Sequence, residues 1–168
     1  MSGGTTDRMV VRRLVSGGQT GVDREALDVA LELGIPCGGW CPRGRKSESG
    51  PIPARYPLRE TPTSAYPERT ERNVRDADGT LVLTRRAPKG GTGLTVSLAR
   101  RVGRPVRVVD LEEPPEAADI VAWLEREGVG VLNVAGPRES EAPGIHDQAV
   151  LFLRELLSQA AADVQRGR

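Results

Sequence analysis

Three short glycine-bearing segments carry residues that could bind an anion. SGGQTG (16–21) follows the apolar run MVVRRLV, KGGTG (89–93) follows TLVLT, and NVAGPRES (133–140) follows VGVL. Glycine allows the backbone to approach a ligand closely, and free N–H groups at the start of a following helix favour negative charge. The predicted ligand-binding residues in these segments are Ser16, Gly17, Gly18, Gln19, Thr20, Gly21, Gly90, Gly91, Thr92, Thr95, Asn133, Gly136, Arg138, Glu139 and Ser140.

Neither of the two common nucleotide motifs is present in the first segment. SGGQTGVDREAL fits neither G-x-G-x-x-G nor G-x-x-x-x-G-K-[ST], which argues against an ordinary NAD site and a P-loop. About 20 residues further on, where an NAD-binding fold places an acidic residue, the chain has Arg43 and Arg45. We add these arginines to the predicted site because they favour a ligand with further negative charge. The alternatives are a tight turn that needs glycine for its backbone and an exposed basic loop.

Two carboxylates lie nearest the predicted site. Asp23 and Glu139 could each act as a general base or simply cap a helix. The single histidine, His146, has no second histidine to form a metal site, and Cys37 and Cys41 are interpreted as buried thiols rather than metal ligands. We therefore predict no metal site and assign no catalytic residue beyond these two candidates.

Strand and helix patterns alternate along the chain. Short apolar runs predict strands, and apolar residues at helical spacing predict helices that end at glycines. The predicted strands are 9–15, 35–41, 79–84, 104–111 and 129–136, and the predicted helices are 22–34, 67–77, 93–103, 116–128 and 145–161. An irregular connection is expected over 42–67, where Pro, Ser and Arg are frequent.

This alternation predicts an α/β fold: a Rossmann-like three-layer α/β/α sandwich with a mainly parallel sheet of five strands or slightly more. One domain is expected over 9–161, with a disordered leader at 1–8 and a frayed tail at 162–168. All three glycine segments follow strands and so fall on the carboxyl edge of the sheet, where such folds bind ligands. The sequence thus predicts that segments far apart in the chain converge on one ligand.

Composition narrows the possible partners. The 168 residues carry 24 basic and 23 acidic side chains, a net charge of +1, which gives no electrostatic reason to expect nucleic acid or an anionic membrane as partner. No segment has the length and hydropathy of a signal core or a membrane span. We expect a cytoplasmic protein.

Several quoted segments together resemble the putative molybdenum carrier family. They are SGGQTGVDREALDVALELGIPCGGWCPRGR, IPARYPL, ERTERNV, DGTLVL, GGTGLT and LNVAGPRES with the following PGI, and they span about 10–157. This family is also described as the circularly permuted YpsA-type branch of the SLOG superfamily, related to lonely-guy and lysine-decarboxylase-like Rossmann proteins. The resemblance implies a Rossmann-like fold, self-association and a pocket for a nucleotide-like or phosphorylated ligand. The implied ligand classes are the molybdenum cofactor and a nucleotide.

One position departs from the lonely-guy pattern P-G-G-x-G-T-x-x-E. The position of its catalytic glutamate is occupied by Thr95, which cannot supply a carboxylate. Our leading hypothesis is therefore a binding or carrier protein for a small phosphorylated ligand. The alternative is a nucleotide-processing hydrolase of the N-glycosidase or phosphoribohydrolase type that uses Asp23 or Glu139, and a purely structural protein is the third.

Two further expectations concern the loops. Ile52, Tyr56 and Leu58 have few apolar neighbours in sequence, so we expect part of 42–67 to cover a neighbouring subunit or the mouth of the site, which would give a homo-oligomer. If SGGQTG holds an anion through backbone N–H groups, Gly18→Val should weaken ligand binding more than it lowers stability.

Overall fold

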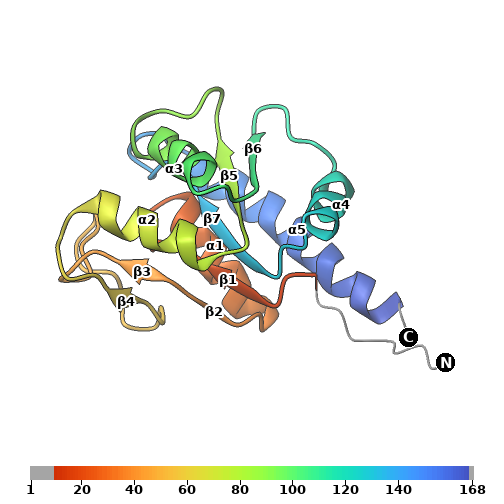
Figure 1. Cartoon of the computed structure of the whole chain (residues 1–168), viewed down its shortest axis with the longest axis horizontal. Helices are drawn as coiled ribbons and strands as arrows, with labels where there is room; N and C mark the ends of the chain where they lie inside the picture. Colours follow the sequence, from red (N-terminus) through yellow and green to blue (C-terminus); the bar gives the residue numbers. More distant parts are fainter. Residues whose placement is uncertain (1–9, 167–168) are drawn as a thin grey trace.

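The fold is built on a five-stranded parallel sheet in a computed structural model that describes residues 10–166 (Figure 1). The strand order is β2-β1-β7-β5-β6, and every pair of neighbours is parallel. The strands are β1 (Arg13–Val15), β2 (Cys37–Gly38), β5 (Gly79–Thr84), β6 (Val106–Asp110) and β7 (Val131–Ala135). All six residues of β5 are buried, as expected for a strand covered on both faces.

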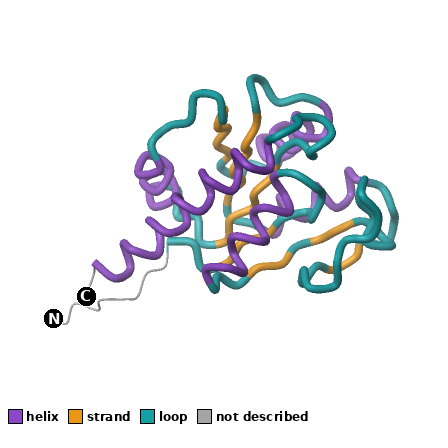
Figure 2. Tube along the Cα trace, turned by 180° about the vertical axis from the view of Figure 1, so that it is seen from behind, coloured by secondary structure: helices purple, strands orange, loops and turns teal. Residues whose placement is uncertain are grey.

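Helices cover both faces of this sheet. On one face α1 (Val22–Leu33) packs against α5 (Ile145–Arg166), which also packs against α4 (Ala117–Arg126). On the other face α2 (Tyr66–Asp76) packs against α3 (Gly90–Arg101). Figure 2 shows the long helix α5 crossing the back of the molecule. The fold is thus the predicted Rossmann-like α/β sandwich.

The predicted strand 35–41 is divided in two. Its first half is β2 in the main sheet, whereas β3 (Trp40–Cys41) pairs in parallel with β4 (Arg59–Glu60) in a separate two-stranded sheet. Gly39 lies at the break with a φ of +128°, and a Cβ there would meet the backbone of Ser16. The strand leaves the sheet at this glycine because few other residues adopt that conformation.

The ends of other helices differ from the predicted ends by a few residues. The helix predicted from 93 begins at Gly90, so the second glycine segment is the first turn of α3 rather than a loop before it. The last helix runs to Arg166, beyond the predicted end at 161, so the described part of the predicted tail is helical. The predicted leader at 1–8 lies outside the described residues. Within residues 10–166, no helix is long and apolar enough to cross a membrane.

The long connection between β3 and α2 packs on its own chain. Ile52 and Tyr56 are buried in the core, and the Tyr56 hydroxyl donates to Asp28 of α1 at 2.6 Å. The guanidinium of Arg45 donates to the carbonyl oxygens of Ile52, Pro53, Tyr56 and Leu58. Ile52 and Tyr56 thus find apolar partners in their own chain, and the expectation that part of 42–67 covers a neighbouring subunit or the mouth of the site stays a prediction, as does self-association.

The close approach of β7 to its neighbours gives a test of this packing. A Cβ at Gly136 would lie 2.6 Å from Val22 Cγ2 and nearer still to the carbonyl oxygen of Leu83. We expect Gly136→Ala to cost about 2 kcal/mol, seen as a fall in Tm of roughly 4–8 °C by circular dichroism. Gly91→Ala is the control, since a Cβ there meets no described atom within 4 Å. Equal melting temperatures for the two variants would contradict the packing.

Candidate functional site

A cavity of about 350 Å³ lies at the carboxyl ends of the central strands. Because β7 lies between β1 and β5, the segments that follow these three strands are neighbours in space. Helix α2 closes the opposite side. The lining residues are Gly17, Gln19, Asp23, Tyr66, Pro67, Arg69, Thr70, Asn73, Gly90, Gly91, Thr92, Leu94, Thr95, Asn133, Ala135, Gly136, Arg138 and Glu141.

All three glycine segments contribute to this cavity. Ten residues singled out from the sequence line it: Gly17, Gln19, Asp23, Gly90, Gly91, Thr92, Thr95, Asn133, Gly136 and Arg138. Eight others do not, namely Ser16, Gly18, Thr20, Gly21, Arg43, Arg45, Glu139 and Ser140. The predicted convergence is present, but only part of each segment takes part in it.

The N-terminus of α3 is the feature of the cavity best suited to an anion. Gly90, Gly91 and Thr92 form the first turn of α3, and N–H groups in a first turn have no partner within their helix. This turn contains no Asp or Glu, and no side chain among the described residues caps it with a hydrogen bond. A Cβ at Gly91 would meet no described atom within 4 Å. Packing therefore does not require glycine here, and its effect is to keep the helix end open.

The N-terminus of α1 is different because the chain already supplies negative charge there. Asp23 and Glu25 lie in its first turn, and both are buried. An acidic side chain in the first turn satisfies the helix dipole in the way a bound anion would. The first glycine segment is thus a poorer site for a ligand phosphate than the sequence suggested.

The role expected for Gly18 needs correction. Gly18 has a φ of +76°, and a Cβ there would lie 3.1 Å from Ile52 Cδ1 and closer to Leu58. This glycine lets the 42–58 segment pack over the loop after β1 and does not line the cavity. Gly18→Val should therefore lower stability first, contrary to the expectation from sequence.

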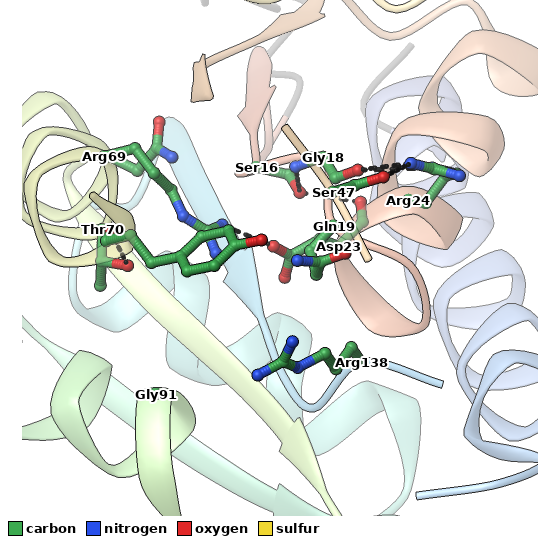
Figure 3. Close-up of polar contacts among 12 residues, drawn as sticks. Ser16, Gly18, Gln19, Asp23, Arg24, Ser47, Arg69, Thr70, Gly91 and Arg138 are labelled. Atoms are coloured by element: carbon green, nitrogen blue, oxygen red, sulfur yellow. Dashed lines mark hydrogen bonds and ion pairs between the residues drawn. The ribbon is translucent and has the colours of Figure 1, made fainter. Parts of the chain in front are cut away.

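A buried ion pair joins the two helical layers beside the cavity. Arg69 Nη1 of α2 donates to Asp23 Oδ2 of α1 at 2.9 Å, with side chains that are 13% and 5% exposed (Figure 3). The guanidinium occupies the space where a side chain at Gly17 would lie. Burial raises the pKa of Asp23, and Arg69 opposes that rise. Within the described part of the chain, Asp23 Oδ1 and Arg69 Nε have no hydrogen-bond partner. Among the described lining residues, only Asp23 of this pair presents a buried carboxylate to the cavity.

Three cationic side chains lie near the aromatic ring of Tyr66. Lys46, Arg69 and Arg138 lie 4.7, 5.4 and 6.0 Å from its ring centroid. Arg138 also donates from Nε to Glu141 Oε1 at 3.1 Å. Of these cations, Arg69 and Arg138 line the cavity, and together with the α3 terminus they make it suitable for an anion.

Helix α2 supplies most of the lining residues that sequence reasoning missed: Tyr66, Pro67, Arg69, Thr70 and Asn73. Only Asn73 and Val74 of this helix are fully buried, although it covers one side of the sheet. A helix that covers a sheet but has few apolar residues must face something polar. The low number of apolar residues in this helix was therefore the signal that could have pointed to these lining residues.

Glu139 has a structural role. Its carboxylate accepts hydrogen bonds from the backbone N–H groups of Gly144 at 2.7 Å and His146 at 3.0 Å, and so caps α5. These amides lower the pKa of Glu139. The capping alternative therefore describes Glu139, and Asp23 is the carboxylate of the two that lines the cavity.

Several other predicted site residues make hydrogen bonds within the protein, and one is exposed. Ser16 Oγ donates to the carbonyl oxygen of Asp23 at 2.8 Å, and Arg43 is exposed. Thr95 is buried in the cavity wall and donates to the carbonyl oxygen of Gly91 at 3.0 Å. Asn133 donates from Nδ2 to Thr80 Oγ1 of the neighbouring strand at 3.3 Å, which fixes its amide in the middle of β7.

Comparison with known proteins agrees with this architecture. Residues 14–157 match the model of the circularly permutated YpsA SLOG family. The chain belongs to this family. It is also similar to a crystal structure at 1.45 Å resolution of a putative molybdenum carrier protein from Syntrophus aciditrophicus SB. The two chains are 42% identical with a TM-score of 0.86, and the match covers 88% of this chain and 96% of the other. No curated protein matches the chain.

The ion pair beside the cavity gives a second test. Arg69→Met leaves Asp23 buried without its cation, and we expect a loss of about 3 kcal/mol at pH 7. Because burial raises the pKa of folded Asp23 above its ordinary 3.8, the folded state takes up the proton first. The loss should therefore shrink as the pH falls from 7 towards 4, as measured by urea unfolding across this range.

Arg72→Met is the matched control on the same helix. Arg72 is 40% exposed, lies 4.0 Å from Glu68, and its guanidinium lies 4.7 Å from the centroid of the Trp40 ring, so its loss should cost about 1 kcal/mol or less at any pH in this range. A similar, pH-independent loss in both variants would argue against a buried pair.

Proposed function

We propose that this protein binds a small phosphorylated ligand in the strand-end cavity, as a binding or carrier protein. The phosphate would lie at the N-terminus of α3, and the rest of the ligand would lie along α2 towards Asp23 and Gln19. Figure 3 shows Gly91 across the cavity from the group formed by Arg69, Asp23 and Gln19. The name of the similar protein from Syntrophus aciditrophicus, a putative molybdenum carrier, supports a carrier role.

One observation carries the proposal: a helix terminus left open within a cavity that also contains two arginines. Of the helices that begin at this sheet edge, α1 and α5 have carboxylates at their N-termini, whereas the first turn of α3 contains no acidic residue. The carboxylate of Glu141, which pairs with Arg138, lies beside this turn, 3.8 Å from where a Cβ of Gly90 would be. Each charge-assisted hydrogen bond to a bound anion contributes about 1.5–3 kcal/mol. The open terminus of α3 can therefore supply much of the affinity for a phosphate.

The size of the cavity favours a compact ligand. About 350 Å³ is at the small end of the range of roughly 300–1,000 Å³ for ligand pockets. A nucleoside monophosphate or a single pterin phosphate suits this volume better than a dinucleotide.

A molybdopterin-type cofactor matches the residues in two respects. Its phosphate would meet the α3 terminus, and the polar edges of its pterin ring would meet Gln19 and Asn133, which are buried polar residues in the lining. No cluster of three or more His, Cys, Asp or Glu side chains that could hold a metal ion occurs among the residues that the structure describes. The fit thus concerns the organic part of the cofactor.

The glycine at the helix end provides the sharpest test of the anion site. Gly91→Glu places a carboxylate in the first turn of α3, where it suits the helix dipole but repels a bound phosphate. We expect an unchanged or higher Tm together with at least about a tenfold loss of affinity for nucleoside monophosphates by calorimetry. Gly91→Ala controls for the side chain itself. Full affinity in the folded Gly91→Glu protein would refute the proposed phosphate position.

The identity of the ligand is a separate question. Native mass spectrometry of the purified protein, followed by analysis of released small molecules, should yield a compound with a phosphate group. Release of a molybdopterin or of a nucleotide would each select one of the two ligand classes. A reproducibly bound ligand without an anionic group would contradict the proposal.

A nucleotide hydrolase is the second candidate, and the buried Asp23 is the observation that favours it. Its raised pKa and position in the lining are typical of a catalytic carboxyl group. Incubation with nucleoside monophosphates and chromatography for released base would distinguish the two functions. We expect no release under the carrier proposal, whereas turnover that is abolished by Asp23→Asn would establish the enzyme.

A further inference from the structure

Three predicted ligand residues from two glycine segments hold the side chain of Glu48, and a fourth holds its backbone. The carboxylate of Glu48, in the long connection after β3, accepts hydrogen bonds from the hydroxyls of Thr20 and Ser140. It also accepts from the backbone N–H of Ser140 at 3.3 Å and lies 3.9 Å from Arg138 Nε. The backbone N–H of Glu48 donates to Gln19 Oε1 at 3.0 Å. We call Thr20, Arg138 and Ser140 the Glu48 cradle.

The donors of this cradle are of the kinds that bind oxyanions. Hydroxyls, a backbone N–H and an arginine converge from the loops after β1 and β7, and a carboxylate is their acceptor. Partial burial raises the pKa of Glu48, but the hydrogen bonds from Ser140 and Thr20 outweigh it, and the net pKa is lowered. Glu48 is therefore held as an anion.

The cradle adjoins the cavity through a shared residue. Arg138 lines the cavity and also faces Glu48, and Gln19 likewise lines the cavity and holds the Glu48 backbone. An anion in the cradle and an anion at α3 would thus both be near Arg138.

We propose that the Glu48 cradle is a second oxyanion subsite, filled by Glu48 until a ligand with two anionic groups displaces it. This inference rests on the proposed function, in which the first anionic group lies at the N-terminus of α3. The ligand class is narrowed to a phosphate compound with a second phosphoryl or carboxylate group.

The segment that carries Glu48 has anchors that do not depend on the carboxylate. Arg45 is bonded to the carbonyl oxygens of the 52–58 stretch, and Tyr56 is buried and bonded to Asp28. Replacement of Glu48 should therefore empty the cradle without unfolding the segment.

Calorimetry with inorganic phosphate as the probe can separate the two subsites. Four proteins are compared: the wild type, Gly91→Glu, Glu48→Ala, and the double variant Glu48→Ala with Gly91→Glu. Gly91→Glu closes the α3 site while Glu48 fills the cradle, so it should bind phosphate least. The double variant should bind phosphate about tenfold or more tightly than Gly91→Glu, through the emptied cradle. A further Ser140→Ala substitution should remove this gain.

The outcomes distinguish the two proposals. If the double variant binds phosphate no better than Gly91→Glu, the cradle is not an oxyanion subsite, while the α3 site is unaffected. If the wild type and Gly91→Glu bind phosphate equally, the α3 site fails, and the double variant still tests the cradle. Glu48→Gln keeps the shape of the side chain and should show little gain. Should Glu48→Ala not fold, Glu48→Ser replaces it in the same comparison.

Displacement in the wild type is tested with pyrophosphate and tripolyphosphate, which offer two spacings between anionic groups. At least one should bind the wild type about tenfold more tightly than phosphate, and Ser140→Ala should abolish this preference. The proposal of a ligand with two anionic groups would be overturned if the tighter binding survives in Ser140→Ala. It would also be overturned if neither probe binds the wild type more tightly than phosphate.

Discussion

The central position of β7, between β1 and β5, is the constraint on which the rest of this structure depends. The chain passes from β1 outward to β2, crosses to the far side of the sheet for β5 and β6, and returns to insert β7 in the middle. Because parallel strands joined by right-handed crossovers end on the same edge, the segments after β1, β5 and β7 become neighbours. The cavity follows from this arrangement rather than from any single motif.

The carboxylates of the protein itself limit where the proposed anionic ligand could bind. Each helix that begins at this edge presents unpaired N–H groups, and these favour whichever negative charge is nearest. Asp23 lies in the first turn of α1 and Glu139 caps α5, whereas the first turn of α3 consists of glycines and a threonine without a carboxylate. The chain thereby leaves one helix end open, inside the cavity.

Carboxylates of the protein hold the other cationic groups of the site. Arg69 is paired with Asp23, and Arg138 lies between Glu141 and Glu48. These pairs fix the arginines in place, which would lower the entropic cost of binding the proposed ligand but would require exchange of partners. Membership in the circularly permutated YpsA SLOG family is consistent with this arrangement, since the matched residues 14–157 contain every part of it.

The sequence by itself determined the fold class, the strand and helix order and the edge of the sheet where a site would form. These features depend on local hydropathy and on glycine positions, which are visible in a single chain. It also predicted Asp23, Gly91 and Arg138 as candidate site residues, and all three line the cavity. Tertiary structure alone decided that Arg69 joins them, that Gly18 and Arg45 serve packing, and that Thr20 and Ser140 hold Glu48. The physical reason is that burial and charge pairing depend on contacts across the chain, such as the 46-residue separation between Asp23 and Arg69, which no local pattern encodes.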